Sequence, residues 1–133
     1  MITEDINKKR LSLLEKVLKL SAESKLKWEE TANKDLFTAK IKDEFGVIIE
    51  RTRGSSGVIT YCLYLRDSDN RDLTRISSSD FGGVSIKLGK DDVRVHIAFV
   101  ELFSIARNSA LKIPERLDSA QKLLDQIEDE LPF

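Results

Sequence analysis

The stretch VITYCLYL, residues 58–65, is the longest run of β-branched, aromatic and aliphatic side chains in this sequence. Gly57 precedes it and a polar, turn-forming segment follows it, which is the pattern of a β-strand between two turns. Because successive side chains of a strand point to opposite faces, the run divides into two sets. These sets are Ile59, Tyr61, Leu63 and Leu65 on one face and Val58, Thr60, Cys62 and Tyr64 on the other. Neither set is plainly polar, so we predict a central strand that needs cover on both faces.

The segments before and after this run also alternate and predict further strands. The predicted strands cover residues 37–41, a strand that starts at Val47, residues 58–65 and residues 73–76, with residues 84–88 as a candidate fifth. Residues 42–46 and 67–71 have turn composition, and residues 51–57 predict a glycine-containing hairpin loop. Residues 25–31 predict an extended connector or a short strand in which Trp28 plugs the core. The strands are expected to form an antiparallel meander.

Three segments predict helices. Residues 3–24 repeat leucine and valine at helical spacing, and residues 93–111 are apolar on most sides, with Asp91 or Asp92 as the expected N-cap. Pro114 opens the last predicted helix. Its apolar stripe consists of Leu117, Ala120, Leu123, Leu124, Ile127 and Leu131, and acidic side chains dominate the opposite face.

Together these segments predict an α+β fold: an N-terminal helix, an antiparallel meander sheet of four to five strands and two C-terminal helices packed on one sheet face. We place the helices on the Tyr61 and Leu63 face of the sheet. That choice leaves Ile48, Val58, Cys62 and Tyr64 facing outward. The register alone also allows the opposite assignment.

Composition restricts the class of protein. The chain has 133 residues, 41% apolar and 34% charged, which fits a single domain over residues 1–133. A net charge of −1 excludes strong attraction of the whole molecule to nucleic acid or to an anionic membrane. Cys62 is the single cysteine, so we expect no disulfide and no zinc site. The charged first ten residues lack a signal-peptide core, and we expect a cytoplasmic protein without membrane association or cofactor.

The sequence contains few residues of the types that act in catalysis, and these residues lack the partner residues of known catalytic or metal-binding motifs. His96 is the only histidine, and we expect it to pair locally with Asp92 at a helix start. Cys62 lacks a recognisable activating context in the sequence, since a reactive thiolate needs a helix N-terminus or nearby cations. The acidic turn at residues 67–72 lacks the glycine and the terminal glutamate of a calcium loop, and the tripeptide at residues 80–82 matches a kinase motif by letters only. For each of these residues and segments, we prefer a structural role to a catalytic or metal-binding one.

Arginines form the most prominent polar group. Arg51 and Arg53 lead into a loop that contains Gly54 and Gly57, where guanidinium groups and main-chain N–H groups could hold a phosphate. With Arg75 they are the candidate anion-binding residues. The structural alternative pairs these arginines with neighbouring carboxylates at strand ends.

The sequence therefore favours a small non-enzymatic protein-binding module of the immunity, inhibitor or adaptor type. The interface candidates are Ile48, Val58, Cys62 and Tyr64, and the expected partner is another protein or a second copy of the chain in a homodimer. The alternative is a binder of an anionic ligand, a nucleotide or RNA, through Arg51, Arg53 and Arg75. Nucleic acid is the less favoured partner.

Overall fold

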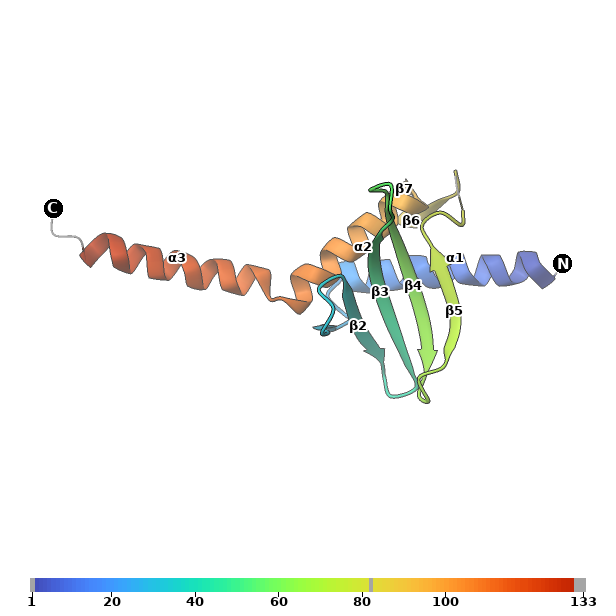
Figure 1. The fold of residues 1–133 in the computed structure, drawn as a ribbon, viewed down its shortest axis with the longest axis horizontal. Coiled ribbons are helices and arrows are strands. Elements are labelled where there is room, and N and C mark those ends of the chain that lie inside the picture. Colours follow the sequence, from blue (N-terminus) through green and yellow to red (C-terminus); the bar gives the residue numbers. More distant parts are fainter. Residues whose placement is uncertain (1, 82, 131–133) are drawn as a thin grey trace.

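Five antiparallel strands, each paired with its neighbour in the chain, form the sheet at the centre of the fold (Figure 1). A computed structural model describes residues 2–81 and 83–130. The strands of the sheet are β1 (Trp28–Glu30), β2 (Leu36–Ile41), β3 (Phe45–Arg53), β4 (Ile59–Asp67) and β5 (Asp72–Ser77). A separate hairpin contains β6 (Ser85–Leu88) and β7 (Asp91–Arg94), and the helices are α1 (Ile2–Ala22), α2 (Val95–Ala110) and α3 (Ile113–Glu130). The predicted α+β meander is confirmed.

The strand predicted to be central is β4, which pairs with β3 on one side and β5 on the other. Leu63 lies opposite Ile49 and Ile76, and all three are fully buried. Phe37 of β2 continues this row across the sheet. An apolar row of this kind on one face needs a helix over it, because each side chain would otherwise expose its surface to water.

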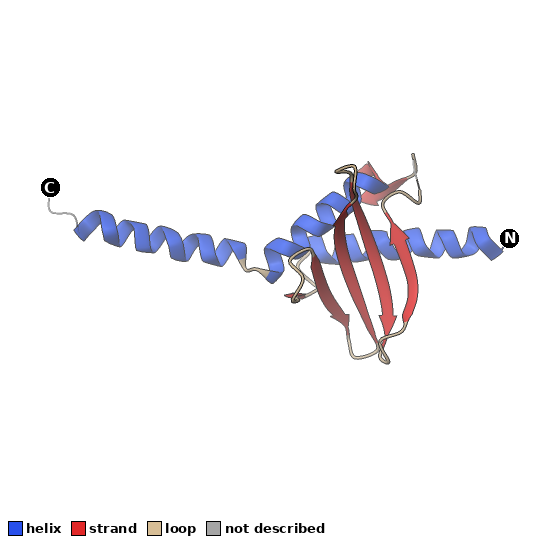
Figure 2. Ribbon diagram, viewed as in Figure 1, coloured by secondary structure: helices blue, strands red, loops and turns tan. Residues whose placement is uncertain are grey.

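Helices α1 and α2 cover that face, and both lie behind the sheet in Figure 2. The ring of Phe103 in α2 lies 5.5 Å from the ring of Phe37 and 5.6 Å from the ring of Tyr61, centroid to centroid. The Arg51 guanidinium lies 4.5 Å from the centroid of the Phe103 ring, within the range of a cation–π contact. The helices therefore cover the Tyr61 and Leu63 face, as predicted.

Two polar anchors hold α1 against the sheet. The indole N–H of buried Trp28 donates a hydrogen bond to the Ser21 hydroxyl, 3.0 Å away, so Trp28 is the predicted core plug. Arg10 donates to the carbonyl oxygen of Arg75 and to the Asp80 carboxylate, and its guanidinium lies over the Phe81 ring. These contacts connect α1 with both edges of the sheet.

The segment before α2 differs from the prediction. Residues Asp91 and Asp92 belong to β7 and do not cap the helix, which begins at Val95 without a side-chain cap. Gly89 has a φ of 64°, a conformation that glycine adopts easily, and it allows the tight turn between β6 and β7. Asp92 forms an ion pair with Lys87 across this hairpin at 2.8 Å. Asp91 and Asp92 pair with residues of β6, and for this reason they do not cap α2.

The last helix also departs from the prediction that both C-terminal helices pack on the sheet. Only α2 does so, whereas α3 has no buried residue and extends away from the sheet (Figure 1). Lys112 separates the two helices and has a φ of 54°, in the left-handed region. Within the described residues, no helix is both long enough and apolar enough to span a membrane.

Replacing Phe103 with alanine should lower the free energy of unfolding by about 3–5 kcal/mol, because the cavity would remove contacts with three strands. Urea denaturation measures the change. Ile97→Ala is the control, since Ile97 lies on the same helix with 48% of its surface exposed, and we expect a change within about 0.5 kcal/mol. Equal losses in the two variants would contradict this account of the core.

Candidate functional site

The face of the sheet opposite α1 and α2 is the candidate site, and we call it the outer face. Strand alternation and register place Thr38, Ile48, Tyr64 and Arg75 in one row across β2 to β5 on this face. Ile48 and Cys62 are buried but do not belong to the core cluster under the helices. In the described part of the chain, no helix lies over this row (Figure 1).

Two side chains of the outer face are held in place by polar contacts. The Tyr64 hydroxyl donates a hydrogen bond to Oε1 of Glu50 at 3.0 Å. The Arg75 guanidinium donates to Sγ of Cys62 at 3.2 Å. Burial of the Tyr64 phenol and its hydrogen bond to Glu50 raise the pKa of Tyr64, so the phenol stays neutral at physiological pH. Tyr64 and Arg75 therefore have defined orientations before any ligand arrives.

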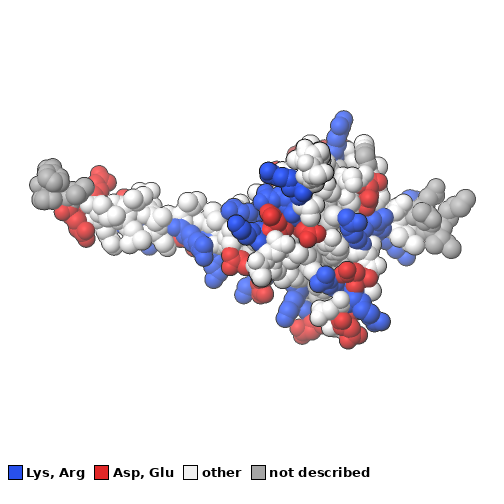
Figure 3. Space-filling view, viewed as in Figure 1, with Lys and Arg blue, Asp and Glu red and all other residues white. Residues whose placement is uncertain are grey.

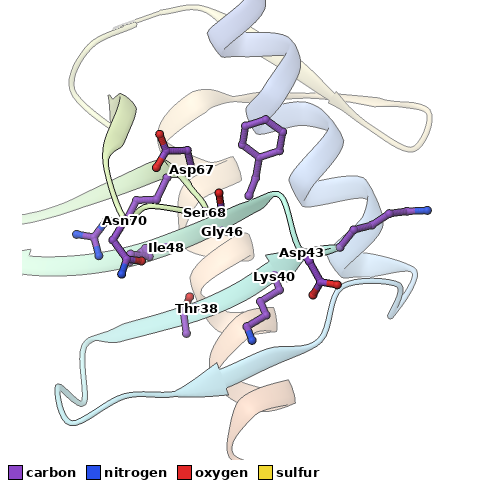
Figure 4. Close-up of a pocket in the computed structure, with 11 residues that line it drawn as sticks. Thr38, Lys40, Asp43, Gly46, Ile48, Asp67, Ser68 and Asn70 are labelled. Atoms are coloured by element: carbon purple, nitrogen blue, oxygen red, sulfur yellow. The ribbon is translucent and has the colours of Figure 1, made fainter.

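A hollow of about 300 Å³ adjoins this row where the β2–β3 and β4–β5 turns approach each other (Figure 4). Its outer-face lining comes from Thr38, Gly46 and Ile48, and the turns contribute Asp43 and Asn70. Gly46 has no side chain to fill the space. The hollow is large enough to receive a side chain of another molecule.

The four predicted interface residues do not share one environment. Ile48 and Cys62 are only 7% and 2% exposed, although no described helix covers them. Ile48 lies between Thr38 and Tyr64 in the register of the sheet, and the Arg75 guanidinium contacts Sγ of Cys62. Tyr64 is half-buried and lies at the surface of the row. Val58 precedes β4 and lies in the exposed loop with 63% of its surface accessible. The structure thus brings Ile48, Cys62 and Tyr64 together and leaves Val58 outside the group.

The three predicted anion-binding arginines lie on two faces. Arg51 belongs to the helix side of the sheet, where it contacts Phe103 and forms an ion pair with Asp35 at 2.7 Å. Strand alternation places Arg53 on the same side of β3, at its exposed end. Arg75 lies on the outer face. No common site for all three exists in this arrangement.

The remaining candidates for chemistry have structural roles or lie apart. The Asp67 carboxylate accepts the backbone N–H groups of Arg71 and Asp69, and these bonds lower the pKa of Asp67. His96 is exposed at the start of α2 and faces the Tyr61 ring at 6.1 Å, whereas Asp92 pairs with Lys87. The described residues contain no cluster of three or more His, Cys, Asp or Glu suited to a metal ion.

Charged side chains of both signs are interspersed over the visible face of the sheet (Figure 3). Arg66 pairs with Asp72 at 2.6 Å and Arg71 pairs with Asp67 at 3.0 Å, so much of the positive charge is compensated locally. Compensation of this kind reduces the attraction of a diffuse anionic partner such as RNA.

Sequence reasoning missed Thr38 and Gly46, which form the hollow together with Ile48. Their signal is the register: once residues 36–41 pair with residues 45–50, Thr38 lies opposite Ile48 and Gly46 lies opposite Lys40. A small residue and a glycine beside an outward isoleucine mark a depression in the sheet surface.

Comparison of the chain with protein-family models, with curated proteins and with solved structures found no match.

The pKa of Tyr64 should lie above the usual range of tyrosine. Glu50→Gln should lower this pKa only in part, because burial of the phenol still raises it. Because the folded state holds this proton more tightly than the unfolded chain, the associated stability is complete below the pKa of free tyrosine. It is lost as pH rises through the pKa of Tyr64 in the folded state. Phenolate absorbance in a Tyr61→Phe background reports Tyr64 alone. An unchanged pKa in Glu50→Gln would contradict the assigned hydrogen bond.

Proposed function

We propose that this protein is a small non-enzymatic protein-binding module and that a partner protein docks on the outer face. By analogy with small domains of this build, an immunity, inhibitor or adaptor role fits it. The observation that carries the proposal is the oriented pair of Tyr64 and Arg75 beside an open hollow.

Tyrosine and arginine are the side chains from which protein interfaces draw much of their binding energy. Each offers apolar contact area together with a hydrogen-bonding group. On this face, Glu50 and Cys62 already restrict their motion. A partner would therefore lose less conformational entropy of these side chains on binding than it would with two freely rotating ones.

The hollow supplies a second element of a binding surface. Interface energy concentrates where an anchor side chain of one partner enters a depression in the other. The space above Gly46, next to Ile48 and Thr38, suits a compact apolar side chain from a partner loop. We expect the aliphatic part of that side chain to contact Ile48 while the partner backbone meets the polar rim.

The alternative, an anionic ligand such as a nucleotide or RNA, has less support. Asp35 engages Arg51, and Arg75 lies on the opposite face from Arg51 and Arg53. Salt distinguishes the two functions, because phosphate binding weakens steeply as salt rises, whereas burial of an apolar anchor does not.

Site-specific cross-linking in the native cells tests the proposal. A photo-reactive amino acid replaces Lys40, which lines the hollow, and in a separate protein it replaces Lys90 in the β6–β7 turn. We expect a discrete protein adduct from position 40 and none of the same mass from position 90.

The hollow is then filled by Gly46→Val, which should reduce the adduct at position 40 at least tenfold. A Cβ at Gly46 meets only the Ala39 carbonyl oxygen, at 3.9 Å, so the variant is expected to fold. Gly83→Val is the matched control, since a Cβ there meets nothing within 4 Å. Absence of an adduct at position 40, or an adduct that survives Gly46→Val, would rule out docking at the hollow.

A further inference from the structure

We infer that α3 pairs with the α3 of a second copy of this chain, in an antiparallel two-helix contact that makes the protein a homodimer. The surface involved is separate from the outer face, so this inference does not depend on the proposed function. It starts from an exposed apolar stripe. Leu117, Leu123, Leu124 and Ile127 are 64%, 60%, 59% and 54% exposed.

The spacing of the stripe is that of a helix that binds another helix. Ile113, Leu117, Ala120, Leu124 and Ile127 follow one another at steps of four, three, four and three residues. Alternating steps of three and four place side chains on the seam of a coiled coil. A helix that packs on a broad globular surface has a wider apolar stripe. The partner predicted by this pattern is therefore a second helix.

The stability of α3 also requires that its apolar stripe pack against another surface. α3 contains 18 residues and is in contact mainly with the end of α2. Isolated helices of about this length are marginal in water, and most helical stability in proteins comes from packing of an apolar face. Within the described residues, Leu117, Ala120, Leu124 and Ile127 are all exposed, and only Ile113, at the start of α3, is half-buried.

From Leu117 to Ile127 the steps of three, four and three residues read the same in both directions, which favours pairing with an antiparallel copy of the helix. If two α3 helices run antiparallel around a centre near residue 122, Leu117 of one copy lies opposite Ile127 of the other. Ala120 then lies opposite Leu124, so a small side chain meets a large one. Leu123 lies beside its own equivalent at the two-fold axis and extends the seam. Each contact occurs twice, as an isologous interface requires.

Charge complementarity favours the same orientation. Four acidic side chains, Asp125, Glu128, Asp129 and Glu130, lie in the last six residues of α3. A parallel pair would place these carboxylates against their equivalents, which is repulsive. An antiparallel pair separates them and brings Glu130 within reach of Arg116 of the other copy. Flanking charges of this kind set the orientation of paired helices.

The shape of the molecule permits this contact. α3 points away from the sheet (Figure 1), so two antiparallel α3 helices would place the two sheets at opposite ends of the pair. A helix of 18 residues is about 27 Å long. Two such helices bury less than the roughly 1,600 Å² of a standard interface, and we therefore expect a dimer that depends on protein concentration.

Sedimentation equilibrium of the full chain over micromolar to submillimolar concentrations tests the dimer. The average mass should rise from one chain, 15.1 kDa, toward twice that value. Leu124→Glu should weaken association at least tenfold by placing a charge in the seam. Gln126→Glu introduces the same side chain outside the seam and should associate as the wild type does. Because α3 is not part of the core, both variants should keep the wild-type urea midpoint of the core.

Disulfide formation tests the orientation. In a Cys62→Ser background, a mixture of Leu117→Cys and Ile127→Cys chains should yield the mixed disulfide, and Ile127→Cys alone should not cross-link to itself. A single-chain mass at every concentration overturns the inference, as does a dimer that Leu124→Glu leaves intact. Self-linked Ile127→Cys overturns the antiparallel arrangement. None of these outcomes bears on cross-linking at position 40, so failure of the dimer and failure of the proposed function are separately visible.

Discussion

The ring of Phe103 contacts Phe37 and Tyr61 and lies beneath the guanidinium of Arg51. Through these contacts, one side chain of α2 ties together three strands, and the position of the helix on the sheet is set. Once α2 occupies the Tyr61 and Leu63 face, the alternation of β4 obliges Cys62 and Tyr64 to face the other way. The position of α2 therefore determines which side chains lie on the outer face. Because these side chains belong to strands that are fixed by the core, their backbone positions are as rigid as the core.

Alternation predicted the central strand and the role of Trp28, because burial of a strand face leaves a local record in the sequence. It did not decide which face is inward, and the rings of Phe103 and Tyr61 in contact show that α2 packs on the Tyr61 face. Other features depend on contacts between distant segments. The ion pair that occupies Arg51 comes from Asp35, in the turn before β2, and no local pattern reveals it. The β6–β7 hairpin had a local signal, a glycine between two alternating segments, but the acidic residues before α2 also matched a helix cap. The stripe of α3 indicated a need for cover, and only the structure shows that the sheet of the same chain does not supply it.

The outer face and α3 differ in how far their apolar side chains are exposed to water. On the outer face, apolar Ile48 and Cys62 are shielded by polar neighbours, so the face is stable in water and selective about what it contacts. On α3, apolar side chains are open to water, and their burial would drive association. If both surfaces act as inferred, each dimer would present two outer faces at fixed separation. A partner with two matching epitopes would then bind more tightly than one epitope allows.

The junction between α2 and α3 consists of Leu111, which packs against the core, and Lys112. Lys112 has a left-handed conformation, which costs a non-glycine residue of the order of 1 kcal/mol. The direction in which α3 leaves the rest of the domain therefore depends on the backbone dihedral angles of Lys112. Substitutions at Lys112 could change the direction of α3 without removing a contact of the core. The architecture of an assembly built from this chain is consequently able to diverge in evolution much faster than the fold of its subunit.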